Sequence, residues 1–139
     1  MTLARYSAID LYMQTETHRV IRNFFGPGKP LGRLIDGWWL GLCIGVRKGQ
    51  RLPLPSVDQR TKFIDGSIFN SDPWRVTHLE LLALSKEGDG VLKDPRRVVA
   101  LATEYANFGL EYLGNECLLQ AEPRLSVLNR LDLTTIAAD

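Results

Sequence analysis

The stretch Leu31–Val46, LGRLIDGWWLGLCIGV, decides how this chain folds. It places Gly37, Gly41 and Gly45 four residues apart, and residues at that spacing share one face of a helix. Each glycine inside a helix costs about 1 kcal/mol relative to alanine, so three of them make an isolated helix unstable. Another part of the chain or another protein must therefore pack closely against this glycine face.

The same stretch contains two adjacent tryptophans, which cannot both face one side of a helix because successive residues turn by about 100°. We therefore expect one tryptophan to lie in the core and the other to face a partner, since tryptophan is enriched at binding hot spots. A third tryptophan, Trp74, is expected to pack locally. The predicted protein interface consists of Gly37, Trp38, Trp39, Gly41 and Gly45.

Turn signals on both sides of this stretch divide the chain further. A first helix is expected over about Ser7–Phe25, and the prolines and glycines of Gly26–Pro30 then force a turn. Two basic residues followed by Gly49 are typical of the end of the glycine-rich helix. Residues 51–70 contain two prolines and predict a long ordered loop, with a short strand or helical turn around Lys62–Phe69.

Two later helices begin with the same signal, Asp-Pro, which places an N-cap residue before a proline at the first helical position. These pairs, Asp72-Pro73 and Asp94-Pro95, predict helices over about 73–86 and 95–120. A final segment, about 123–139, predicts a helical extension. The sequence thus predicts an all-α fold, with residues 1–139 forming a compact single domain of four to five helices and a long central loop that contains proline.

Length and composition exclude several classes of protein. A chain of 139 residues fits one domain with a real core. The N-terminal residues lack the apolar region of a signal peptide, and the longest uncharged run, Gly37–Val46, is too short to span a membrane. Cys43 and Cys117 both fall in apolar helical patterns, which is typical of free buried thiols. We therefore expect a cytoplasmic protein with no membrane contact.

The sequence contains no motif that identifies a reaction. Its two histidines, His18 and His78, have no further ligand at the spacing that a metal site needs. No phosphate-binding glycine loop and no arrangement of a nucleophile with a base is present. We therefore expect a protein that is not an enzyme, with no metal and no cofactor.

Charge is unevenly distributed along the chain. Residues 1–62 hold ten Lys and Arg against four Asp and Glu, whereas residues 63–139 hold seven against twelve. Clustered basic side chains near helix ends can follow a phosphate backbone by charge alone. The alternative is that they form salt bridges with the acidic half or with a partner subunit. The candidate DNA-binding residues are Arg19, Arg22, Lys29, Arg33, Arg47, Lys48 and Arg51.

Several features occur in an order that resembles the small E subunit of bacterial DNA phosphorothioation (DNA sulfur modification) systems. The resemblance covers about residues 29–113, and the helix at Glu104–Asn107 departs from it by being less basic. It implies a non-catalytic helical subunit of a DNA-modification or phage-defence assembly. The matching features are Arg33 with Trp38, Trp39 and Cys43, then Leu52–Pro55, Phe63–Gly66 and Gly109–Leu113.

Two functional hypotheses follow. The first is a small accessory subunit of such a complex, which binds other subunits through the glycine and tryptophan helix and contacts DNA phosphates through its basic half. The second is an adaptor that binds only protein, whose basic half meets an acidic partner or the acidic half of another copy. The sequence leaves open whether the chain forms a homo-oligomer.

Overall fold

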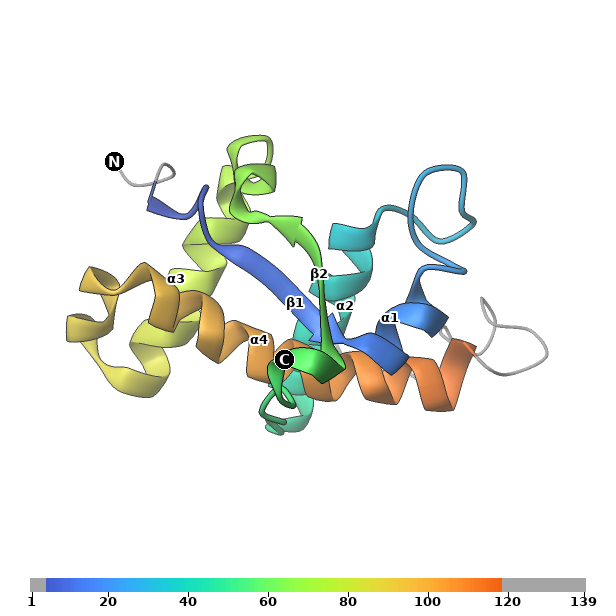
Figure 1. The fold of residues 1–139 in the computed structure, drawn as a ribbon. Helices are drawn as coiled ribbons and strands as arrows, with labels where there is room; N and C mark the ends of the chain where they lie inside the picture. The colour runs from blue at the N-terminus through green and yellow to red at the C-terminus, as the bar shows by residue number, and fades with distance from the viewer. Residues whose placement is uncertain (1–4, 119–139) are drawn as a thin grey trace.

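The computed structural model describes residues 5–118 and shows a mainly helical domain that also contains a small sheet (Figure 1). The fold is therefore mainly rather than entirely α. A short strand was one of the two alternatives expected around Lys62–Phe69 and is present at Arg60–Asp65, whereas the strand at Asp10–Gln14 was not expected. The main elements are β1 (Asp10–Gln14), α1 (Thr15–Ile21), α2 (Leu34–Lys48), β2 (Arg60–Asp65), α3 (Pro73–Glu87) and α4 (Pro95–Leu113).

Helices α2 and α4 pack most extensively and form the centre of the domain. A Cβ atom at Gly41 would lie 2.6 Å from Leu110 Cγ and 3.0 Å from the carbonyl oxygen of Ala106, both on α4. Gly45 and Gly109 approach the backbone of the opposite helix even more closely. The glycine face is thus covered by another part of the same chain, which was one of the two alternatives that the sequence left open.

The first predicted helix, Ser7–Phe25, is wrong in its first half. Residues Asp10–Gln14 form strand β1, which pairs antiparallel with β2, and only Thr15–Ile21 are helical. The signal was present in the sequence, because the apolar residues Leu11 and Met13 lie two positions apart, as in a strand with one covered face. In the structure both are buried, and the residues between and beside them are less buried. The two strands lie in front of α2 and α4 in Figure 1, and β1 contacts α4.

A buried asparagine fixes the proline-containing loop on α4. Asn107 donates hydrogen bonds to the carbonyl oxygens of Leu52 (2.8 Å) and Pro53 (3.2 Å), and it accepts one from Gln14 (2.9 Å). The Leu52 amide also donates to the carbonyl oxygen of Glu104 at 3.0 Å. The loop predicted over 51–70 is therefore ordered up to β2, which begins at Arg60.

The predicted starts of the last two helices are confirmed. Both α3 and α4 have proline at the first helical position, and the Asp94 side chain accepts a hydrogen bond from the Arg97 amide. Helix α2 ends at Gly49, which adopts a left-handed conformation with φ of 66°. Helix α4 ends at Leu113 rather than near residue 120, and a π-helical turn follows over Gly114–Leu118. The predicted helical extension at 123–139 lies outside the residues that the structure describes.

Candidate functional site

A buried arginine joins the beginning of α2 to the beginning of α3. Arg75 is 4% exposed, and its guanidinium group donates hydrogen bonds to Asp36 Oδ1 (3.0 Å) and Asp72 Oδ2 (3.2 Å). Arg33, at the surface, bonds to the same two carboxylates. A buried arginine needs such partners because an unpaired charge is costly away from water. The four side chains therefore set the position of α3 relative to α2.

Two tryptophan rings pack against this arginine. The guanidinium carbon of Arg75 lies 5.0 Å from the centroid of the Trp39 ring and 4.4 Å from that of Trp74, both within cation–π range. The two indole rings meet edge to face at 5.2 Å, and His78 completes the cluster. The sequence had suggested that Trp74 packs only locally, but its ring also contacts Trp39 of α2. Trp74 is 48% exposed.

Beside this cluster, α2 and α3 border an apolar groove of about 520 Å³. Val46, which lines it from α2, is 42% exposed, and α3 carries a further exposed apolar side chain, Leu81, at 55%. The remaining surface of the described chain has few large exposed apolar side chains, Val57 being one. The groove is lined by Trp39, Leu42, Cys43, Val46 and Arg47 from α2 and by His78 and Leu82 from α3.

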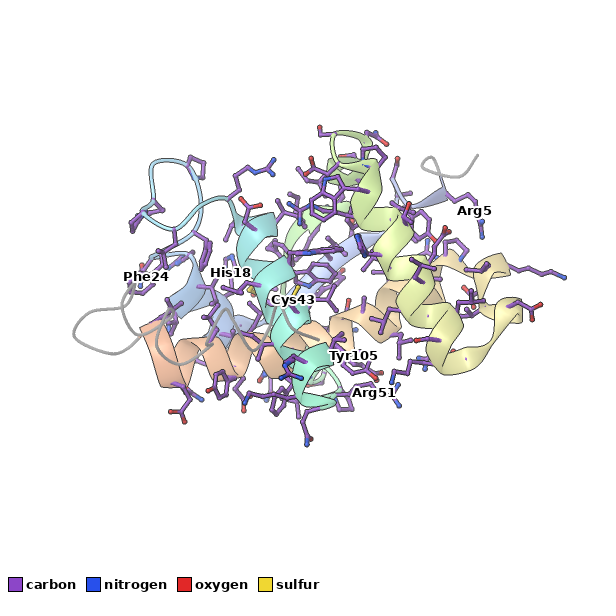
Figure 2. The ribbon with its side chains drawn as sticks, turned by 180° about the vertical axis from the view of Figure 1, so that it is seen from behind. Arg5, His18, Phe24, Cys43, Arg51 and Tyr105 are labelled. Carbon is purple, nitrogen blue, oxygen red and sulfur yellow. The ribbon has the colours of Figure 1, made fainter. Side chains whose placement is uncertain are left out.

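Cys43 lies in this groove, on α2 with α3 beside it (Figure 2). The expectation of a buried thiol is wrong for Cys43, since the residue is exposed at the groove. Although the residue as a whole is exposed, the groove side chains around the thiol shield it partly from water and raise its pKa, and the positive charge of Arg75 acts in the opposite direction. The thiol is therefore poorly suited to act as a nucleophile, because the thiolate is the reactive form.

The five residues of the predicted protein interface lie mostly inside the chain. Gly37, Trp38, Gly41 and Gly45 are buried, and Gly37 packs against the ring of Phe25. Trp39 alone among the five reaches the surface, at the groove. Because the chain itself covers the glycine face, those four residues do not form an exposed surface, and the exposed part of α2 is its opposite face.

The seven candidate DNA-binding residues separate into two groups. Four lie near α1 and the start of α2, and the other three lie at the end of α2, which at 15 residues is about 22 Å long. In the first group, Arg19 pairs with Glu16, and Arg33 pairs with Asp36 and Asp72. Arg22 and Lys29 are exposed.

The second group lies against α4. The Lys48 ammonium group lies 4.6 Å from the centroid of the Tyr112 ring. Arg51 lies 5.6 Å from the centroid of the Tyr105 ring and 3.8 Å from a carboxylate oxygen of Glu104, and Figure 2 shows both labelled side chains at this end of α2. Arg47 lines the groove. Part of the predicted basic surface is therefore neutralised by acidic side chains of the same chain, as the salt-bridge alternative expects.

Sequence reasoning missed the α3 side of the groove. The signal was a second stripe on α3, formed by Trp74, His78 and Leu82, whose four-residue spacing places them on one helix face. The buried face predicted for this helix consisted of Val76, Leu79, Leu82 and Ala83, and Leu82, which is partly buried, also lines the groove.

Within residues 5–118, no three His, Cys, Asp or Glu side chains gather closely enough to hold a metal ion. No helix in that part of the chain has both the length and the apolar character needed to cross a membrane. The chain matches no protein-family model, no curated protein and no solved structure.

Proposed function

We propose that this chain is a non-catalytic helical subunit of a multiprotein complex and that it binds a partner protein in the groove between α2 and α3. The observation that supports this proposal is the gathering of exposed apolar side chains along two helices whose relative position is set by Arg75. Monomeric proteins rarely leave a contiguous apolar surface open to water without a binding role.

The shape and charge of the groove favour an amphipathic helix as the bound element. The apolar side chains of α2 that line the groove recur at three- and four-residue spacing, and His78 and Leu82 of α3 face them; such a groove can accept the apolar face of a helix. Trp39 and Trp74 provide large, rigid contact surfaces of the kind found at binding hot spots. Arg47, in the last turn of α2, lines the groove and favours acidic residues on the bound helix.

The proposal can be tested with displayed amphipathic helical peptides selected for binding to the purified chain. Val46→Asp places a charge in the groove, and Val57→Asp makes the same change at an exposed position outside it. We expect selected peptides to bind Val46→Asp at least about tenfold more weakly, because a charge buried without a partner is costly. The same peptides should bind Val57→Asp as they bind the unaltered chain. Equal binding to all three proteins, or no selected binder, would refute the groove proposal.

A second candidate function rests on the basic residues at the end of α2. We propose that Arg47, Lys48 and Arg51 contact DNA phosphates in a DNA-modification or phage-defence complex of the phosphorothioation type. The support is their location in the last turn of α2 and just beyond it, with Lys48 and Arg51 held against tyrosine rings. The pairing of Arg51 with Glu104 reduces its share of such a contact.

Reversing these three charges to Glu should weaken binding to a short DNA duplex and make binding less dependent on salt concentration. Reversing Lys86 and Lys93, which are exposed on another part of the chain, serves as the control. Light scattering of the same samples measures whether the chain self-associates. DNA binding that is unchanged by the triple reversal would exclude these residues from the contact surface.

A further inference from the structure

A second pocket is lined by residues of the two strands, of the proline-containing loop and of the first half of α4. Its volume is about 350 Å³, and it shares no lining residue with the groove between α2 and α3. Two arginines, Arg60 from β2 and Arg96 from the first turn of α4, line this pocket. A ligand bound in this pocket would therefore not occupy the proposed protein-binding groove.

Arg60 has an unsatisfied hydrogen-bond donor. Its guanidinium carbon lies 5.3 Å from the centroid of the Tyr12 ring, which holds the side chain flat against β1. Its Nε atom is buried and has no hydrogen-bond partner among residues 5–118. Buried donors in folded proteins nearly always have an acceptor, because an unpaired donor has lost its bonds to water without replacement. Arg60 is thus packed on Tyr12 with one donor that the described residues leave unpaired.

The two carboxylates that also line the pocket already have basic partners. Asp10 pairs with Lys62, with 3.2 Å between the charged atoms, and Glu104 pairs with Arg51 at 3.8 Å. Within the described part of the chain, neither Arg60 nor Arg96 forms an ion pair. The positive charge of both arginines is thus available to a ligand.

A hydroxyl group completes the polar lining. Thr103 lies seven residues after Arg96 on α4, so both project from the same face of the helix. The residue is 6% exposed and lines the pocket. Two guanidinium groups and a hydroxyl match an anion that has several acceptor oxygens, which planar guanidinium groups bind through paired hydrogen bonds.

We propose that this pocket is a binding site for a phosphate group, held by Arg60 and Arg96 with Thr103 as a further donor. The phosphate belongs either to free inorganic phosphate or to a small phosphate ester. The volume of about 350 Å³ favours a small ligand.

Isothermal titration and backbone amide NMR shifts test this site, with inorganic phosphate in one arm and adenosine 5′-monophosphate in the other, at constant ionic strength. We expect saturable binding in the millimolar range or tighter, with the largest shifts around Ala100 and Thr103. Arg60→Gln and Arg96→Gln should each weaken binding about tenfold or more, as expected for the loss of a charge-assisted hydrogen bond. Lys93→Gln, outside the pocket, should leave binding unchanged.

The two arms identify the source of the phosphate. Tighter binding of the nucleotide supports an ester, whereas binding of inorganic phosphate alone supports the free ion. Because Arg60 packs on Tyr12, Arg60→Gln is checked for folding by circular dichroism, and exposed Arg96 supplies a variant that does not depend on that packing. The proposal is overturned if neither probe saturates, or if Lys93→Gln weakens binding as much as Arg96→Gln does.

Discussion

The close contact between α2 and α4 predicts that a single methyl group at Gly41 destabilises the fold. In Gly41→Ala the new Cβ would lie 2.6 Å from Leu110 Cγ, which is 0.8 Å less than the 3.4 Å at which ordinary contact begins. The carbonyl oxygen of Ala106, at 3.0 Å, belongs to the backbone and cannot rotate away. The two helices must therefore move apart or strain their side chains.

The expected size of the effect follows from two opposing contributions. Overpacking of a core costs about 1–3 kcal/mol, and rigid backbone on one side favours the upper half of that range. Replacing a helical glycine with alanine returns about 1 kcal/mol through helix propensity. We therefore expect a net loss of about 1–2 kcal/mol in the free energy of unfolding. For a chain of this length, that corresponds to a decrease in Tm of about 3–8 °C.

Urea unfolding followed by circular dichroism measures this loss. Gly90→Ala is the matched control, because no atom lies within 4 Å of a Cβ at that position. Gly109→Ala should cost more than Gly41→Ala, since its Cβ would overlap the backbone of Gly41. A Gly41→Ala protein that is as stable as Gly90→Ala, or more stable, would refute the argument that α2 needs glycine to approach α4.

Three further predictions concern side chains in and around the core. Arg75→Met should lower the free energy of unfolding, measured with urea, by about 3 kcal/mol, because Asp36 and Asp72 lose their buried partner. Arg33→Gln, at the surface, should cost far less. Equal losses in the two variants would contradict the structural role given to Arg75. Burial raises the pKa of Asp36, but the Arg33 amide and guanidinium groups and the charge of Arg75 outweigh it and hold the pKa below the ordinary 3.8. The ionised carboxylate therefore stabilises the fold above about pH 4, and this stability is lost as the pH falls through the lower folded-state pKa. Asp36→Asn should accordingly show a smaller difference in unfolding free energy between pH 7 and pH 3, and an unchanged difference would exclude this role. Tyr6→Phe removes the 2.7 Å hydrogen bond to Glu80 and should lower the free energy of unfolding by about 1 kcal/mol. We expect a lower Tm with an unchanged circular dichroism spectrum, and an unchanged Tm would contradict the prediction.

Local signals in the sequence were sufficient to place the three long helices. Asp-Pro at the start of α3 and α4 and Gly49 at the end of α2 act within a few residues, because they satisfy or terminate the hydrogen bonds of a single helix turn. The requirement that something cover the glycine face also followed from the sequence. These features depend on the energetics of one helix at a time, so they could be predicted without knowledge of the fold.

Strand β1 could not be predicted from local sequence signals in the same way. Its residues have the two-residue alternation of a strand, but they are followed directly by the helical residues Thr15–Ile21, and the two patterns were read as one helix. Strand β1 exists because it pairs with β2, whose first residue Arg60 lies opposite Gln14, far along the chain. Such pairing depends on the whole fold rather than on the local sequence.

The candidate sites were likewise decided by tertiary structure. The sequence showed that α2 has a glycine face and two tryptophans, but only the packing of α4 decided that the glycine face is internal and that Trp39 lies at the surface. The burial of Arg75 and the meeting of Arg60 with Arg96 depend on elements that are distant in sequence. The sequence by itself thus determined where α3 and α4 begin and where α2 ends, through short-range hydrogen bonding and propensity. Tertiary structure alone decided which helix faces stay exposed, because burial depends on what the rest of the chain covers.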